Sequence, residues 1–196
     1  MLSAKTFLTG FIGFSIFLFA CKHEKKNPSR SFISTSSLIK GQIAAVDTSL
    51  SPIMKITTID TTSDTVYIHR EDFAREAGDF LAVPDLGDKK IAVQFTQDSA
   101  IFDESLNRVI INYHPVDPSK TDLKKEQILI TPSSLEGDHF NSIIITMVHD
   151  TKDGYLKKEM LWLMDQSFQV VTTRQLPGQP EKIITVKVTW GEGNNE

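Results

Sequence analysis

The stretch Lys182-Ile183-Ile184-Thr185-Val186-Lys187-Val188-Thr189-Trp190 decides the fold of this chain. From Ile184 onward an apolar residue occupies every second position, and threonine or lysine occupies the positions between. A period of two predicts a β-strand whose apolar side chains point into a core while its polar side chains face water. We therefore expect this segment to be a half-buried strand of a sheet.

Similar strand patterns recur through the second half of the chain, from Lys90 to Trp190. The clearest predicted strands are Asn107–Tyr113, Gln127–Thr131, Ser142–Val148, Tyr155–Met164, Phe168–Gln175 and Lys182–Trp190. Two further strands, Pro52–Ile59 and Thr65–Ile68, are expected before them. Because most of the connections are short, consecutive strands should pair antiparallel as a meander.

Two helices are predicted ahead of the long run of strands. Ser36-Ser37 would cap the first, and Pro84 would end the second near Ala82-Val83. Their apolar stripes are Ile39, Ile43 and Val46 in the first helix, and Phe73, Ala77, Phe80 and Leu81 in the second. The expected fold class is α+β: a curved antiparallel β-meander sheet with one or two N-terminal helices packed on its concave face. A β-barrel or sandwich with a helical lid is the alternative.

The N-terminus has the three parts of a bacterial signal peptide. Lys5 supplies a positive charge, Thr6 to Phe19 form an uncharged apolar run, and Ala20 precedes Cys21, the only cysteine. The apolar run is shorter than the about 20 residues of a membrane-spanning helix. Leu18-Phe19-Ala20-Cys21 matches the lipobox, in which the cysteine takes a lipid. We expect lipidation of Cys21; an uncleaved span and an ordinary secretory signal are the alternatives.

The remainder of the chain divides into two regions. Lys22 to Ser37 is rich in Lys, Ser, Asn and Pro and poor in apolar residues, which is typical of a flexible segment. The predicted organisation is a signal peptide over residues 1–20, a flexible tether over residues 21–37 and a single globular domain over residues 38–196. That length is sufficient for one self-contained hydrophobic core.

The N-terminal features resemble those of a known class of proteins. The Phe-rich apolar run, the lipobox at Cys21 and Lys22 directly after it are similar to the small lipoproteins of Bacteroidota-type bacteria. The resemblance implies lipid anchoring in the cell envelope, and Lys22 in place of an aspartate favours the outer membrane over the inner one. It leaves open whether the domain faces the periplasm or the cell surface, and it implies no activity.

Composition and motifs argue against several functions. The chain has 21 Lys and Arg against 25 Asp and Glu, so it lacks the basic surface that nucleic acids require, and no nucleic-acid partner is expected. His69 lies near Glu71 and Asp72, but no second histidine is close by in the sequence, so neither a metal site nor a cofactor is expected. No G-x-S-x-G motif follows Cys21, and we do not expect an enzyme.

Three short segments resemble a pattern at which envelope proteins of such bacteria are O-glycosylated. The pattern is an Asp followed by Ser or Thr and then by an apolar residue or Thr. It occurs at Asp60-Thr61-Thr62, Asp64-Thr65-Val66 and Asp98-Ser99-Ala100. The resemblance implies Thr61, Thr65 and Ser99 as modification sites; the competing interpretation is ordinary turn and strand chemistry.

Two hypotheses of function follow. The first is a non-catalytic binding or interaction module, tethered by lipid to the envelope, whose sheet or loops contact an envelope protein. The second is a carrier of apolar ligands in a cavity of the curved sheet. Residues that could line that cavity are Met160, Trp162, Met164, Val186, Val188 and Trp190. Ordinary hydrophobic core is the competing interpretation of the same six residues.

Overall fold

The computed structural model of the chain describes residues 32–133 and 137–191. The predicted signal peptide and Cys21 lie outside these residues. The strands are β1 (Ile53–Ile59), β2 (Thr62–Ile68), β3 (Phe95–Gln97), β4 (Ile101–Asp103), β5 (Arg108–Pro115), β6 (Leu123–Thr131), β7 (His139–Thr151), β8 (Gly154–Leu163), β9 (Ser167–Gln175) and β10 (Lys182–Thr189). The predicted strands are confirmed with shifted ends, while a short helix, α4 (Lys89–Ala92), opens the region where strands were expected.

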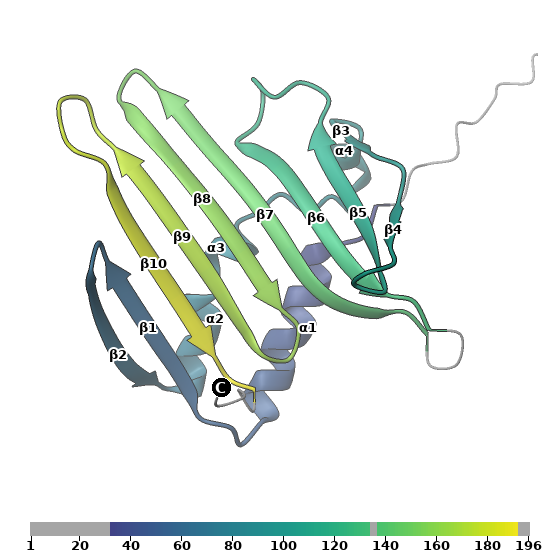
Figure 1. Cartoon of the computed structure of the whole chain (residues 1–196), viewed down its shortest axis with the longest axis horizontal. Coiled ribbons are helices and arrows are strands. Elements are labelled where there is room, and N and C mark those ends of the chain that lie inside the picture. Colours follow the sequence, from purple (N-terminus) through teal and green to yellow (C-terminus); the bar gives the residue numbers. More distant parts are fainter. Residues whose placement is uncertain (1–31, 134–136, 192–196) are drawn as a thin grey trace, which may run out of the picture.

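The strands form one open antiparallel sheet (Figure 1). Its order is β2-β1-β10-β9-β8-β7-β6-β5-β3, and β4 pairs with β5. The run from β5 to β10 is the predicted meander, whereas β1 joins its far edge by pairing with β10. The α+β prediction is confirmed. The barrel or sandwich alternative is wrong, because the described strands lie in a single sheet that does not close.

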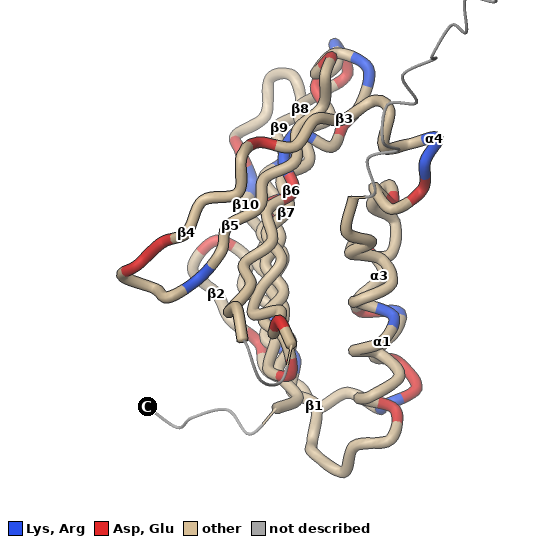
Figure 2. The backbone as a smooth tube through the Cα atoms, turned by 90° about the vertical axis from the view of Figure 1, so that its right-hand side faces the viewer, with Lys and Arg blue, Asp and Glu red and all other residues tan. Residues whose placement is uncertain are grey.

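α1 (Thr35–Thr48) confirms the first predicted helix, and Ile39, Ile43 and Val46 are buried as its stripe requires. The helix lies along one face of the sheet, which we call the inner face (Figure 2). Its cap differs from the prediction. The N-cap is Ser34, whose Oγ accepts a hydrogen bond from the N–H of Ser37 at 3.1 Å.

The second predicted helix forms as three short pieces. They are a 3₁₀ turn, η1 (Arg70–Asp72), followed by α2 (Phe73–Glu76) and α3 (Gly78–Leu81). The chain departs from helical geometry at Ala77, directly before Gly78, and glycine has a low helix propensity. The apolar stripe was nevertheless predicted correctly, because Phe73, Ala77 and Phe80 are buried and Leu81 packs against the core.

The predicted tether extends too far along the chain. It was drawn to Ser37, but Phe32, Thr35 and Ser36 are already buried. Phe32 packs its ring on Tyr113 with 4.8 Å between ring centroids. The folded domain therefore includes Phe32. The partner that buries this residue lies on β5, which is far away in the sequence, so the polar composition around Phe32 concealed its contact.

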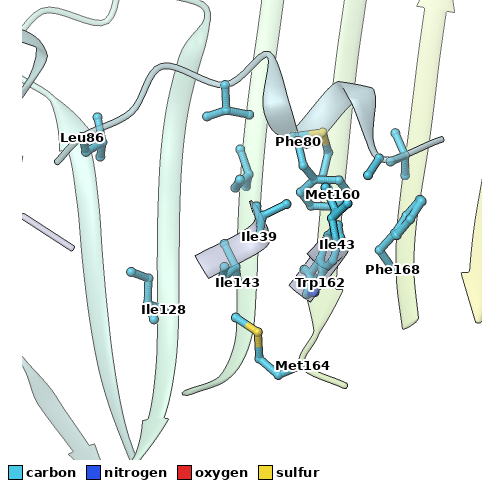
Figure 3. Packing of buried hydrophobic residues seen from close by; sticks show 14 of the residues in the cluster. Ile39, Ile43, Phe80, Leu86, Ile128, Ile143, Met160, Trp162, Met164 and Phe168 are labelled. Carbon is cyan, nitrogen blue, oxygen red and sulfur yellow. The ribbon is translucent and has the colours of Figure 1, made fainter. Parts of the chain in front are cut away.

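The hydrophobic core fills the space between the helices and the inner face (Figure 3). Five aromatic side chains pack at its centre: Phe73, Phe80, Trp162, Phe168 and Trp190. Phe80 meets Trp162 edge to face with 5.0 Å between ring centroids, and Phe168 stacks on Trp162 at 5.1 Å. Aromatic pairs of this kind add about 0.5–1.5 kcal/mol each beyond the burial of their area.

This packing decides the role of the six residues considered as cavity lining. Met160, Trp162, Met164, Val188 and Trp190 are at most 7% exposed and belong to the core, and Val186 packs against it. They therefore take the competing role of ordinary core, because the helices cover this part of the inner face. Trp190 also borders a hollow of about 200 Å³ beside Val46 and Ser49.

Candidate functional site

The inner face changes from apolar to basic along its strands. Residues that lie opposite one another on β7, β8, β9 and β10 form rows across the sheet. The first row is Ile143, Trp162, Phe168 and Val188, and the second is Ile145, Met160, Val170 and Val186. The third row is Met147, Lys158, Thr172 and Ile184, and the fourth is His149, Leu156, Arg174 and Lys182. All four rows share one face because side chains alternate along a strand.

The helices cover the first two rows and leave the fourth open. In Figure 1, the β7–β8 and β9–β10 hairpins, and the strand ends that they join, extend beyond α2 and α3. A groove of about 630 Å³ lies over this uncovered part, within the range of about 300–1,000 Å³ that is usual for small-molecule sites. Its lining includes Leu156, Lys158, Thr172, Arg174, Lys182 and Ile184.

Arg174 and Lys182 form the open end of the groove. Both side chains are exposed, and the two residues lie directly opposite each other on β9 and β10. Like charges at such positions repel. Within the described part of the chain, neither side chain forms an ion pair or a hydrogen bond. The groove is also lined by Lys158 and by a single carboxylate, Asp153. Because Lys158 pairs with Asp79, the positive charge of the groove comes from Arg174 and Lys182, on a chain whose net charge is −4.

The other end of the groove continues toward α3 as a narrower hollow of about 140 Å³. Its charged groups are paired: Lys158 Nζ lies 2.6 Å from Asp79 Oδ1 and ties β8 to α3. His149 Nδ1 lies 3.1 Å from Asp122 Oδ2. The apolar walls of this hollow are Ala82, Met147 and Leu156. The groove thus runs from unpaired cations to an apolar end.

Sequence analysis missed this groove. It named Met160 and Trp162 as inward residues of their strand but gave no role to Lys158, which has the same parity. The available signal was the appearance of polar residues at inward positions near the hairpins, where Thr172, Arg174 and Lys182 continue the parity of core residues. A charge at an inward position marks the place where the covering layer ends.

A second cluster surrounds a buried acid on β6, near the start of α1. The Glu126 side chain is fully buried, and its Oε2 accepts a hydrogen bond from Thr35 Oγ1 at 3.2 Å. Its Oε1 has no hydrogen-bond partner among the described residues. The pKa of Glu126 is raised to about 8, mainly by burial; the Thr35 hydrogen bond opposes this rise and the Asp85 carboxylate contributes to it. Glu126 is therefore mostly protonated at neutral pH.

Glu126 belongs to the attachment of α1 rather than to the groove. Ser34, the N-cap of α1, donates a hydrogen bond to Asp85 Oδ2 at 2.9 Å, and the N–H of Ile33 donates to the Tyr113 hydroxyl at 3.3 Å. Tyr113 lies opposite Glu126 in the sheet. These contacts fix the N-terminal end of α1 to β5 and β6. Sequence analysis missed Glu126, because its predicted strand began one residue later, at Gln127; the available signal was that Glu126 has the parity of Ile128 and Ile130.

The three residues proposed for O-glycosylation are accessible. Thr61 lies in the β1–β2 turn, Thr65 on β2, and Ser99 in the connection between β3 and β4, and all three are exposed. Modification of these residues stays a prediction. The proposed lipid site, Cys21, lies outside the described residues.

Residues 32–133 and 137–191 contain neither a cluster of metal ligands nor a helix that could span a membrane. No three His, Cys, Asp or Glu side chains in these ranges are arranged so that they could hold a metal ion. His69 lies before η1 without a side-chain capping bond, and His114 Nε2 pairs with Asp98 Oδ1 at 2.9 Å. None of the helices within these ranges has the length and apolar character needed to cross a membrane.

Comparisons with protein-family models, with curated proteins and with solved structures find no match.

Proposed function

We propose that this chain is a non-catalytic binding module of the bacterial cell envelope, held there by a lipid on Cys21, and that it binds a small molecule in the inner-face groove. The observation that carries the proposed site is the uncovered end of the inner face. There, half-buried apolar side chains and two unpaired cations surround one concave space. A few polar groups around an apolar floor are typical of ligand sites.

The proposal combines the two hypotheses that the sequence raised. The binding module is retained, and the ligand site of the carrier hypothesis moves from the covered centre of the sheet to its third and fourth rows. Leu156, Arg174 and Lys182 replace core residues such as Trp162 as the side chains that would contact a ligand. The non-catalytic part of the proposal rests on the sequence, which lacks the hydrolase motif considered above.

Filling the groove tests the ligand site. Thr172 lies in the third row and lines the groove, whereas Thr173, the next residue, pairs with Lys157 and Ile183 on the outer face. Thr172→Trp should place an indole in the groove and remove the small molecule that co-purifies with the full-length chain from its own membranes. Thr173→Trp adds the same ring on the opposite face and should leave that molecule bound.

Mass spectrometry of the molecules extracted from the two variants and the unchanged chain gives the answer. The proposed function requires at least one small molecule that is bound to the unchanged chain and to Thr173→Trp and is depleted in Thr172→Trp. If the Thr172→Trp and Thr173→Trp extracts are the same, the groove is not the ligand site.

Replacement of Cys21 tests the anchor. Cys21→Ala should abolish the incorporation of labelled palmitate, and the precursor should persist at its full size, because lipoprotein signal peptidase cleaves only before a lipidated cysteine. Gel electrophoresis with detection of the label measures both effects. Lys22→Ala, a substitution of the next residue, should keep label and cleavage. Unchanged labelling of Cys21→Ala would show that the lipobox interpretation is wrong.

A further inference from the structure

We infer that the ligand of the groove is an amphiphile with one anionic head group and one apolar chain, with its head group at Arg174 and Lys182 and its chain directed toward α3. The shared chemistry is a carboxylate or a phosphate on an alkyl chain. This inference rests on the proposed function, because it names the class of ligand for the same groove.

The charges at the open end of the groove define the head group. Arg174 and Lys182 are cross-strand neighbours, and the Cβ atoms of such neighbours are about 4.5–5.5 Å apart. At this spacing, one anionic group can accept hydrogen bonds from both side chains. Guanidinium donors match two oxygens of a carboxylate or a phosphate, and ammonium groups bind either as a point charge. An anion would also relieve the repulsion between the two cations, and no described carboxylate forms an ion pair with either of them.

The rest of the groove defines the chain. Leu156 lies beside Arg174 in the fourth row, and Ile184 lies one row closer to the core. Beyond them the groove narrows between Ala82 and Met147, and the groove and the narrower hollow share Leu156 and Lys158. The polar groups at this end already satisfy one another through the Lys158–Asp79 and His149–Asp122 pairs. What remains for a ligand there is apolar surface, whose burial is favourable.

Photocrosslinking of the full-length chain in its own membranes tests this assignment. The probes are palmitate with a photoreactive group near the end of its chain and the matching fatty alcohol, which has the same chain and no charge. Peptides that carry the crosslink are identified by mass spectrometry. We expect the palmitate probe to label α3 and the part of β7 around Met147. The alcohol should label the same segments about tenfold less, because it cannot form the charge-assisted hydrogen bonds.

Variants at the open end identify the residues that bind the head group. Arg174→Gln combined with Lys182→Gln should lower labelling by the palmitate probe about tenfold. Both side chains are exposed, so the domain should remain folded, which circular dichroism checks. Lys187→Gln removes an exposed lysine from the outer face of β10 and should leave labelling unchanged. Equal labelling by both probes, or no effect of the double variant, would overturn the inference.

Competition separates the possible sources of the anion. Unlabelled palmitate or hexadecyl phosphate should displace the probe, and the more effective of the two identifies the head group. Inorganic phosphate at the same concentration should not displace it; equal displacement would show that the site binds a free anion, and the inference would be wrong. A co-purified molecule could be depleted in the Thr172→Trp extract although the palmitate probe does not label the groove. In that case the proposed function stands and this ligand class is wrong.

Discussion

Between about pH 5.5 and pH 7.5, the free energy of unfolding of this protein should fall by about 1.4 kcal/mol for each pH unit. The reference for this fall is the Glu126→Gln variant, measured at the same pH values. The pKa of Glu126 is raised from 4.5 to about 8, mainly by burial. In the unfolded chain this carboxyl ionises first, whereas the folded chain keeps its proton until the pH approaches 8. The folded state therefore binds more protons throughout this range, so its stability decreases as the pH rises.

Denaturant unfolding at pH 5.5, 6.5 and 7.5 measures this difference. Over the full interval between the two pKa values, the loss is on the order of 4 kcal/mol. Glu159→Gln is the matched control, because Glu159 is an exposed acid on β8 that pairs with Lys157 at 2.9 Å. Its unfolding free energy should follow that of the unchanged chain. Parallel curves for Glu126→Gln and the unchanged chain would contradict the burial of an uncharged Glu126.

Trp162→Ala should lower the free energy of unfolding by about 3–5 kcal/mol. The Trp162 side chain is fully buried, and its ring contacts those of four other aromatic residues: Phe73, Phe80, Phe168 and Trp190. Truncation to alanine removes these contacts and leaves a cavity that the rigid sheet cannot close. The midpoint of denaturant unfolding, measured at the pH where the chain is most stable, gives the change.

Two further variants make the Trp162 result specific. The indole N–H of Trp162 has no hydrogen-bond partner among the described residues, so Trp162→Phe removes an unpaired buried donor together with part of the packing. Trp162→Phe should lower the free energy of unfolding clearly less than Trp162→Ala does. Removing the unpaired donor favours the folded state, whereas the loss of packing disfavours it. Tyr67→Ala removes an aromatic side chain that is 75% exposed on β2 and should change stability by less than about 0.5 kcal/mol. A Trp162→Ala loss as small as that of Tyr67→Ala would contradict the packing described for the core.

Local patterns were sufficient for the elements and for their buried faces. The alternation from Ile184 to Trp190 identified a strand with one face in the core, and Val188 and Trp190 are buried. The stripe of Ile39, Ile43 and Val46 identified α1 in the same way. These predictions succeed because the period of side chains along a helix or a strand is a property of the backbone, so neighbouring residues alone reveal it.

Pairing between distant segments was not available from such patterns. β1 pairs with β10, and Phe32 packs on Tyr113, although in both cases the partners are far apart in the chain. Glu126 is a third example, because its hydrogen-bond partner, Thr35, is also far away in the chain. On β6, Glu126 follows the alternation of the buried Ile128 and Ile130, whereas Leu123 is buried at an odd separation from it. The register of β6 against β7 shifts between Leu123 and Lys125, so the bulge turns Leu123 to the inner face.

The groove shows most clearly what the sequence determined and what the tertiary structure decided. Trp162 and Lys158 have the same parity on β8, so the sequence alone contains the information that they share one face. Whether a residue on that face becomes core or ligand site depends on the layer above it. Trp162 is fully buried, whereas Arg174 and Lys182, opposite each other on β9 and β10, are exposed. The hairpin that joins β9 to β10 extends beyond α2 and α3 (Figure 1). Where the covering layer ends depends on how separate segments pack together, so only the folded chain defines the site.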